Sequence, residues 1–273
     1  MSDFDLTIGI IGGGYVGSAT AIFECEKVKC IIYDIDETKR NPKDCQMKDV
    51  VNCDIIFICV PTPIGKDGQC DINIIDNVIT QLKKEKEDLC NIVIRSTIPP
   101  FTSKRMGTHF MPEFLTEKNW QQDVKSRSKW IIGINNEKDG INIKQKMTQL
   151  INLSYEYNKI NSSDILFVNC EEAECSKYIR NCFLATKVSF FNEMYNYCEA
   201  LNLSYDTIRS LVVLDNRIGE SHTHVPGHDG LFGFGGTCFP KDLAALNFEF
   251  KSKGINNNIL NAVQQRNIID RQK

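Results

Sequence analysis

The 273-residue sequence has no long apolar run, no excess of basic charge and no paired-cysteine spacing. No stretch approaches the roughly 18 apolar residues that a membrane-spanning helix needs. The apolar stretch after Met-Ser-Asp-Phe-Asp is too short for a signal peptide. A formal net charge of −3 means that the chain has no excess of positive charge with which to bind nucleic acid. We therefore expect neither a membrane nor a nucleic acid as a partner.

The twelve cysteines are scattered, with no Cys-x-x-Cys pair and no Cys/His spacing that suits zinc. Cys59, Cys182 and Cys198 fall in apolar or helical patterns and are interpreted as reduced core thiols. Such usage indicates a reducing compartment, and we expect the cytoplasm. Three of the four histidines lie between residues 215 and 236, in a turn-rich loop without matching carboxylates, so no metal is expected.

The composition, 42% apolar and 25% charged, is that of a globular protein with a substantial core. The length favours two domains. Apolar runs alternate with helical segments up to residue 168, and only helical spacing follows. This pattern predicts an α/β fold: a Rossmann-type, doubly wound, mostly parallel sheet over residues 1–168, then an all-α dimerisation domain over 169–273 with a long central helix.

A glycine-rich turn, Gly12-Gly13-Gly14-Tyr15-Val16-Gly17, follows the first expected strand. Gly12 permits the tight turn, Gly14 lets a pyrophosphate approach the backbone, and Gly17 lets the next helix pack on the strand. The second strand ends at Asp34, twenty residues after Gly14. A carboxylate there would bind the adenosine ribose hydroxyls and repel a 2′-phosphate, which predicts NAD as the cofactor.

Further strands are expected at residues 54–60, 91–95, 130–134 and 165–168, with a helix over 73–89. The loops Val60-Pro61-Thr62-Pro63 and Ser96-Thr97-Ile98-Pro99-Pro100 would then lie at the carboxyl edge of the sheet, where open α/β folds bind ligands. Glu113 and Glu117 come next, four residues apart, and their spacing alone favours a solvated face.

Residues 171–201 contain neither Gly nor Pro and repeat apolar residues at helical spacing. They predict one helix about 45 Å long, part of which would lie against another helix or another chain. Lys177 and Asn181 are four residues apart and share a face of this helix, although a lysine on a long helix is most often solvated. A shorter helix is expected over residues 205–213.

A cysteine follows three glycines in the segment Gly233-Phe234-Gly235-Gly236-Thr237-Cys238-Phe239-Pro240-Lys241-Asp242. The glycines let the backbone approach a ligand closely. Lys241 places a cation near the sulfur, and a nearby cation favours the thiolate, which is the attacking species. Cys238 is thus either a nucleophile or a packed core thiol.

Together, and in this order, these motifs resemble the nucleotide-sugar (UDP-glucose/GDP-mannose) dehydrogenases. The matching segments are residues 12–17, 60–63, 96–99 and 112–117, Ser176-Lys177 through Asn181, Asn192-Glu193, and residues 215–219 and 229–242. The last segment, which holds the cysteine loop, is among the most distinctive of the family.

The resemblance implies an enzyme that oxidises the C6 alcohol of a nucleotide sugar to a carboxylate in two steps, with two NAD⁺ and no metal. Cys238 would attack the aldehyde to give a thiohemiacetal, which becomes a thioester that water cleaves. Lys177 would stabilise an oxyanion or shuttle a proton, and Asn181 would bind the sugar from the same helix face. Asp242 and Thr97 would hold a water in the proton path.

The resemblance also assigns Glu117 as the general base of thioester hydrolysis, with Glu113 binding sugar hydroxyls or orienting the water. Arg217 would reach the substrate of the neighbouring subunit in a homodimer built on the long helix. The implied cofactor contacts are Gly12, Gly14, Tyr15, Val16, Gly17, Asp34, Lys39, Val60, Pro61, Thr62, Thr97 and Glu117. The implied substrate contacts are Glu113, Phe114, Leu115, Lys177, Asn181, Arg217, Phe232, Gly233, Gly235 and Cys238.

Two departures from the family are visible. A short polar stretch, Lys39 to Asp49, replaces a longer excursion near the adenine. The chain also stops at Lys273, where the family continues into a domain that binds the nucleotide of the sugar donor, and the loss of such remote contacts should lower both rate and affinity.

Three readings follow from the sequence. The first is a compact dehydrogenase whose substrate is a UDP-sugar, UDP-glucose before GDP-mannose or a UDP-N-acetylhexosamine. The second is a dimeric NAD-binding module without turnover. The third is a β-hydroxyacid or 6-phosphogluconate type dehydrogenase. The cysteine loop argues against this third interpretation, because those enzymes use no cysteine thioester.

Overall fold

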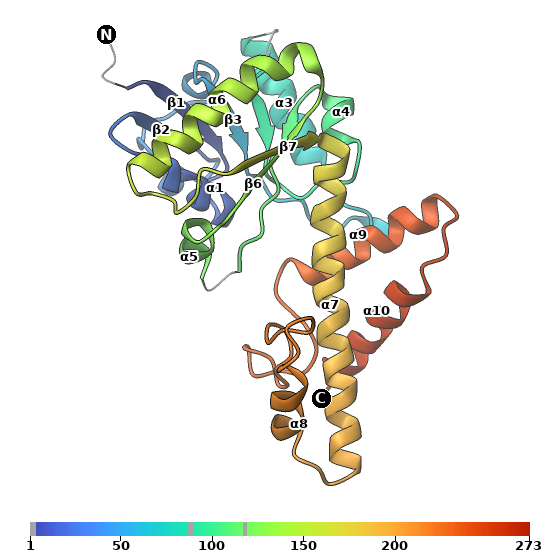
Figure 1. Cartoon of the computed structure of the whole chain (residues 1–273). Helices are drawn as coiled ribbons and strands as arrows, with labels where there is room; N and C mark the ends of the chain where they lie inside the picture. The colour runs from blue at the N-terminus through green and yellow to red at the C-terminus, as the bar shows by residue number, and fades with distance from the viewer. Residues whose placement is uncertain (1–3, 87–89, 117–118) are drawn as a thin grey trace. The chain divides into compact units, whose positions relative to one another are not determined.

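The computed structural model describes residues 4–86, 90–116 and 119–273 (Figure 1). The strands are β1 (Leu6–Ile11), β2 (Val28–Tyr33), β3 (Ile55–Ile58), β4 (Ile92–Ile94), β5 (His109–Phe110), β6 (Trp130–Ile134) and β7 (Ile165–Asn169). The α-helices are α1 (Tyr15–Thr20), α2 (Met47–Val50), α3 (Asn73–Glu85), α4 (Thr102–Met106), α5 (Trp120–Lys125), α6 (Glu137–Glu156), α7 (Cys170–Ala200), α8 (Tyr205–Val212), α9 (Phe239–Ser252) and α10 (Asn258–Asp270). Three short 3₁₀ turns are η1 (Ala21–Phe23), η2 (Glu37–Lys39) and η3 (Lys66–Gly68).

The strands form one seven-stranded sheet in the order β2-β1-β3-β4-β5-β6-β7. Neighbouring strands are parallel except β5 and β6, which pair antiparallel. The prediction of a Rossmann-type, mostly parallel sheet followed by a helical region with one long helix is confirmed. The antiparallel step at β5 was not predicted, because β5 is only two residues long and gives no pattern in the sequence.

Both faces of the sheet are covered, and β3 and β4 at its centre are apolar at every position. Ile55 and Phe57 of β3 belong to a core cluster that includes Met147 of α6. Ile56 and Ile58 belong to a second cluster that α3 completes from the other face. A strand buried on both sides is a continuous apolar run rather than an alternating one, as β3 is here.

The chain divides into two compact units. The sheet unit comprises Met1–Pro63 and Asp71–Lys177, and the helical unit comprises Ile64–Cys70 and Tyr178–Lys273. The helix α7 thus begins in the first unit and continues through the second. The short segment 64–70 joins the helical unit, where Gly68 lies against the backbone of Ala244 in α9. No helix in the described part of the chain is long and apolar enough to cross a membrane.

Glu174 of α7 closes the start of α4 within the sheet unit. Its carboxylate is fully buried and accepts hydrogen bonds from the backbone N–H groups of Phe101 (2.6 Å) and Ser103 (2.8 Å). The first N–H groups of a helix have no partner within the helix, so a side chain from elsewhere satisfies them. Burial raises the pKa of Glu174, and the hydrogen bonds from Ser103 and Phe101 oppose that rise.

We predict that Glu174→Ala lowers the free energy of unfolding by about 1–3 kcal/mol, because it leaves the N–H groups of Phe101 and Ser103 without their acceptor. A raised folded-state pKa favours the protonated form. The stability that the protonated Glu174 side chain contributes is therefore fully present below the ordinary glutamate pKa of 4.5. It is lost as the pH rises through the raised pKa of the folded state. The deficit of the variant should therefore narrow as the pH rises. Urea titrations at several pH values test this, with Glu199→Ala, at an exposed position on the same helix, as the control. A deficit that does not change with pH contradicts the prediction.

Candidate functional site

The glycine turn between β1 and α1 leaves open space at its middle glycine. Gly12 has a φ of +99°, and a Cβ there would lie 2.7 Å from the carbonyl oxygen of Cys59. A Cβ on Gly17 would lie 1.9 Å from the carbonyl oxygen of Gly12. At Gly14, by contrast, no atom lies within 4 Å of the Cβ position. The outer glycines are required by the fold, and the middle one leaves room for a ligand, as a pyrophosphate needs.

Asp34 braces this turn from the end of β2. One carboxylate oxygen accepts a hydrogen bond from the N–H of Gly13 (2.6 Å), and the other accepts one from the N–H of Asp36 (2.8 Å). Lys39 forms an ion pair with Asp36 at 3.3 Å and is half exposed. The carboxylate and the open glycine thus lie on the same turn, which fits the predicted adenosine end of a dinucleotide.

The neighbouring predicted contacts lie on loops that are tied to each other. The hydroxyl of Ser96, next to Thr97, donates a hydrogen bond to the carbonyl oxygen of Val60 (2.6 Å). Thr62 is buried, whereas Pro61 is exposed. The exposed ring of Tyr15 contacts Trp120 edge to face at 6.3 Å, and Val16 packs against the core.

Lys177 and Glu113 form a buried pair in the sheet unit. The Lys177 ammonium lies 3.6 Å from Glu113 Oε2 and donates a hydrogen bond to the Glu113 carbonyl oxygen. The N–H of Leu115 donates to the Glu113 carboxylate, and the Phe114 ring lies 5.5 Å from the ammonium. Both charged side chains are nearly inaccessible, so Lys177 is not the solvated lysine that its helix position alone would favour. The four predicted residues, Glu113, Phe114, Leu115 and Lys177, are brought together.

Arg95 is a second buried cation in this unit and was not predicted. It is 2% exposed, and its Nε and Nη2 atoms have no hydrogen-bond partner among the described residues. Burial lowers the pKa of its guanidinium, while Cys59 and Glu113 oppose that shift. Nothing in the sequence indicates that Arg95 is buried, since it follows an ordinary apolar strand.

Asn181 and Asp242 form the corresponding buried contact in the helical unit. Asn181 Nδ2 donates to Asp242 Oδ2 (2.6 Å), and Lys241 Nζ donates to Asp242 Oδ1 (2.9 Å). The Cys182 thiol donates to the carbonyl oxygen of Asp242 at 3.7 Å. Burial raises the pKa of Cys182 to about 12, with Asp242 adding to the rise. This thiol is therefore structural, as the sequence indicated.

Cys238 occupies the N-cap position of α9. Its carbonyl oxygen accepts the first helical hydrogen bond, from the N–H of Asp242 (2.9 Å), and Pro240 lies in the first turn. Its thiol is half-buried and makes a weak contact, at 3.8 Å, with the hydroxyl of Thr237. A helix N-terminus favours a thiolate, because its unpaired N–H groups carry partial positive charge.

Side chains from two helices hold the glycine loop that precedes Cys238. Asn267 of α10 accepts a hydrogen bond from the N–H of Phe234 (2.7 Å) and donates one to its carbonyl oxygen (3.0 Å). Asn192 of α7 accepts one from the N–H of Gly233 (2.9 Å). These two asparagines were not assigned any role from the sequence, although Asn192 falls in a matching segment. An asparagine carries no signal of a contact with a loop far along the chain.

The remaining predicted site residues have different surroundings. Arg217 is almost fully exposed and pairs with Asp215 at 2.5 Å. Phe232 packs in the core of the helical unit against Tyr195, with ring centroids 5.3 Å apart. A Cβ on Gly235 would lie 2.1 Å from Arg271. Glu117 lies outside the described residues. No group of side chains among those described could hold a metal ion.

The fold and the glycine turn define a dinucleotide-binding protein of the Rossmann class. A model of the NAD-binding domain of the UDP-glucose/GDP-mannose dehydrogenase family matches residues 41–152, and a model of the central domain of that family matches residues 171–268. The chain belongs to the UDP-glucose/GDP-mannose dehydrogenase family.

Two relatives agree with this family assignment, and a solved structure agrees with the fold. The chain is 30% identical to a UDP-glucose 6-dehydrogenase of Rickettsia bellii, over 96% of this chain and 67% of that protein. It is 30% identical to a UDP-glucose 6-dehydrogenase of Pseudomonas aeruginosa, over 94% of this chain and 64% of that protein. The fold matches a UDP-glucose dehydrogenase of Pyrobaculum islandicum with a TM-score of 0.80 at 23% identity, over 98% of this chain and 69% of that one. The chain thus spans about two thirds of the length of these proteins.

We predict that Gly233→Ala destabilises the helical unit by about 1–3 kcal/mol more than Gly230→Ala does. Both glycines have positive φ, +69° and +78°, so the backbone strain is shared. Only at Gly233 would the Cβ clash, 2.5 Å from Asn267 Oδ1, whereas Gly230 faces open space. Denaturant unfolding measures the free energy of unfolding of both variants, and the difference between them reports the clash. Equal losses of stability would show that Asn267 does not hold the loop.

Proposed function

We propose that the chain carries out an NAD-dependent, two-step oxidation of a nucleotide sugar at C6, with UDP-glucose as the substrate and UDP-glucuronate as the product. The observation on which the proposal rests is the set of contacts that hold Cys238 in place at the N-terminus of α9. A hydrogen-bond network of the buried Asn181 and Asp242 with the half-buried Lys241 fixes the helix whose N-terminus carries this thiol. A packed core thiol would need no such support.

Cys238 would act as the nucleophile on the sugar aldehyde. Its sulfur adds to the carbonyl carbon, and the carbonyl oxygen takes up a proton to give a thiohemiacetal. Loss of a hydride from that carbon, with the hydroxyl proton, leaves a thioester. Water then replaces the sulfur, and the thiol is restored as the carboxylate leaves. A thiol suits both steps, since it adds readily to aldehydes and is a good leaving group.

The polar residues would transfer protons and stabilise charge during the reaction. Lys177, whose ammonium is already desolvated, would stabilise the alkoxide oxygen or carry its proton. Its pairing with Glu113 supports a role for that carboxylate in binding sugar hydroxyls or orienting the hydrolytic water. Asn181 would bind the sugar, and Asp242 with Thr97 would hold a water in the proton path. Glu117 remains the proposed general base.

Bound NAD⁺ would supply the hydride acceptor for both steps. The open space at Gly14 and the Asp34 carboxylate would bind its pyrophosphate and adenosine ribose. The other proposed contacts are Gly12, Tyr15, Val16, Gly17, Lys39, Val60, Pro61, Thr62, Thr97 and Glu117. Phe114, Leu115, Phe232, Gly233 and Gly235 are proposed for the sugar nucleotide.

We predict that the chain yields about two NADH per UDP-glucose and that Cys238→Ser lowers the rate by about a thousandfold or more. The control is Cys175→Ser, a half-buried thiol on α7 that we place in no chemical step. NADH absorbance measures the yield, and GDP-mannose and a UDP-N-acetylhexosamine in parallel assays test the substrate. Turnover by Cys238→Ser at the wild-type rate would exclude the thioester route.

A second candidate is an NAD-binding module without turnover, which the match of the family's NAD-binding domain to residues 41–152 would support by itself. Separate calorimetric titrations with NAD⁺ and UDP-glucose distinguish the two. Binding of NAD⁺ without binding of the sugar nucleotide favours the module. Binding of both, with NADH formed, favours the enzyme.

We also propose that the chain is a homodimer through α7. Ile179, Phe183, Phe190 and Tyr197 are 55–66% exposed on this helix. Their spacings of four, seven and seven residues place them on one stripe, as in a helix that packs along another helix. Arg217 would then reach the substrate of the partner subunit.

We predict a sedimentation-equilibrium mass near twice the 31.1 kDa of one chain. The double variant Phe183→Glu/Phe190→Glu should shift it to the monomer, because each buried Phe contributes about 1.5–3 kcal/mol to association. Ile141→Glu, at an equally exposed position on α6, should leave the mass unchanged. A wild-type monomer at micromolar concentration would contradict the proposal.

A further inference from the structure

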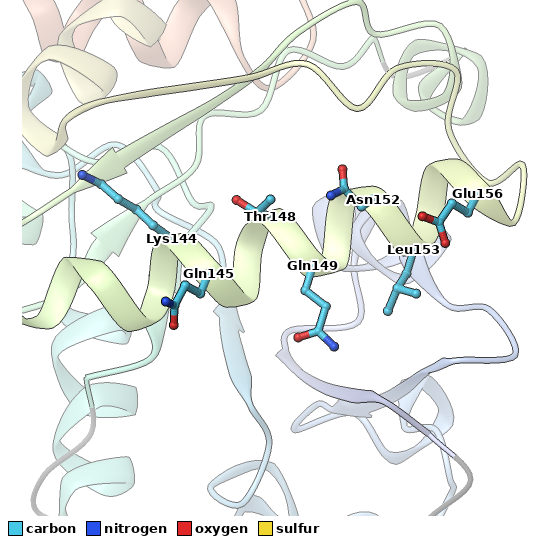
Figure 2. A pocket seen from close by; sticks show the side chains of 7 residues that line it. All are labelled: Lys144, Gln145, Thr148, Gln149, Asn152, Leu153 and Glu156. Carbon is cyan, nitrogen blue, oxygen red and sulfur yellow. The ribbon is translucent and has the colours of Figure 1, made fainter.

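The hollow along α6 in Figure 2 is lined by Lys144, Gln145, Thr148, Gln149, Asn152, Leu153 and Glu156. All of these lie on one helix, and their mixed polar side chains select no ligand. A second hollow, near Cys45 and Cys53, has thiols whose pKa values burial raises, to about 12 for Cys53, so they are not reactive. His222, in the loop before Cys238, offers more.

His222 has an unusual backbone conformation. Its φ is +64°, in the left-handed region that only a few per cent of non-glycine residues occupy, His, Asn and Asp more often than the others. A residue held there costs stability and persists only when its surroundings fix it. The strain lies sixteen residues before the proposed nucleophile, Cys238, in the same helical unit.

Two helices fix the backbone on both sides of His222. Before it, Lys187 of α7 donates hydrogen bonds to the carbonyl oxygens of Ile218 (2.8 Å) and Gly219 (3.0 Å). After it, the Tyr205 hydroxyl of α8 donates to the carbonyl oxygen of Thr223. Thr223 is fully buried, and its hydroxyl donates to the carbonyl oxygen of Glu220 (2.7 Å). The left-handed turn at His222 is therefore imposed by its neighbours.

The imidazole ring is directed onto the first residue of α9. Its centroid lies 5.6 Å from that of the Phe239 ring, at an angle of 41°. Phe239 also contacts Phe234 edge to face at 6.2 Å. Phe239 follows Cys238 directly, so the His222 ring packs on the residue next to the thiol. Its buried Nδ1 has no hydrogen-bond partner among the described residues, which is unfavourable for folding.

The charges around His222 oppose its protonation. Burial lowers the pKa of its imidazole, and Lys187, His228 and Arg180 lower it further. Two of these groups lie on α7 and one on the loop, while Phe239 on α9 is uncharged. The nearby carboxylate of Glu220 instead contacts Arg209 at 3.5 Å and His224 at 3.8 Å. The ring is thus neutral near pH 7, and a proton on it would add a further positive charge to this cluster.

We propose that His222 is a positioning residue for Cys238: its neutral ring holds Phe239, and with it the first turn of α9, so that the thiol stays at the helix N-terminus. Protonation of the ring would drive it away from the cations of α7 and loosen that turn. The thiolate would then lose the stabilisation that the helix N-terminus gives it. The inference rests on the proposed role of Cys238 as nucleophile.

Alkylation of Cys238 by iodoacetamide, in the absence of NAD⁺ and sugar, tests this. The rate is read at the Cys238 peptide by mass spectrometry, so the other eleven thiols do not interfere. For an isolated thiol below its pKa the rate rises about tenfold per pH unit. In the wild type we expect a steeper rise at pH values below the ordinary histidine pKa of 6.5, where His222 also loses its proton.

Two variants separate the ring from its charge. His222→Asn tolerates the left-handed backbone but removes the ring, and should slow alkylation at neutral pH by about two- to tenfold, the equivalent of one lost aromatic contact. His222→Phe keeps an aromatic ring without a titrating group. It should react at nearly the wild-type rate at neutral pH, but with the simple tenfold dependence on pH. His224→Asn, at the neighbouring exposed histidine, should behave as wild type.

Each result decides the inference. The inference is overturned if His222→Asn is alkylated with the rate and pH profile of the wild type. It is also overturned if His224→Asn slows alkylation as much as His222→Asn does. If His222→Asn does not fold, His222→Phe decides alone: a simple pH dependence supports the inference, and the steeper wild-type profile overturns it. Because no cofactor or sugar is present, normal alkylation in a chain that forms no NADH would contradict the proposed function and leave the positioning role intact.

Discussion

The helical unit depends on one buried carboxylate. Asp242 is 1% exposed, and an ionised carboxylate at such a place is very unfavourable without partners. Lys241, its neighbour on α9, supplies one donor and Asn181 of α7 a second, so Asp242 has both donors only while the two helices stay packed together. The first turn of α9, and with it Cys238, takes its position from this contact. Removal of either donor would leave part of the charge unpaired inside the unit, at a cost of several kcal/mol.

The sheet unit contains a similar arrangement earlier on α7. Lys177 and Glu113 are both buried, and Arg95 adds a second cation nearby. Buried ion pairs of this kind seldom stabilise a fold more than apolar residues of the same size would. Their presence is therefore better explained by chemistry than by stability. One continuous helix thus supplies a lysine to one buried network and, one turn later, an asparagine to another.

The sequence was sufficient for the elements that have strong local patterns. Apolar runs gave the parallel strands, the glycine spacing gave the turn that Asp34 braces, and the helical period gave α7. Contacts between distant segments could not be predicted in this way. Asn267 holds the backbone of the cysteine loop through two hydrogen bonds and Asn192 through one, and such contacts leave no periodicity in the sequence. The buried state of Arg95 and the left-handed backbone of His222 also depend on tertiary packing alone.

The cysteine loop is held by its own unit rather than by a ligand. Its glycines at 230, 233 and 236 have positive φ, which would suit a flexible segment as well as a tightly shaped one. Asn192 and Asn267 bond to its backbone, and the Arg271–Asp229 ion pair of 2.8 Å joins its start to the end of α10, so the shape is specified. If Cys238 is the nucleophile, as proposed, it needs no binding energy from remote parts of the substrate to be placed, whereas the sugar nucleotide would need such energy to be held over it. If the chain proves slow on UDP-glucose, the deficit should therefore appear in sugar-nucleotide binding, with the reactivity of Cys238 unchanged.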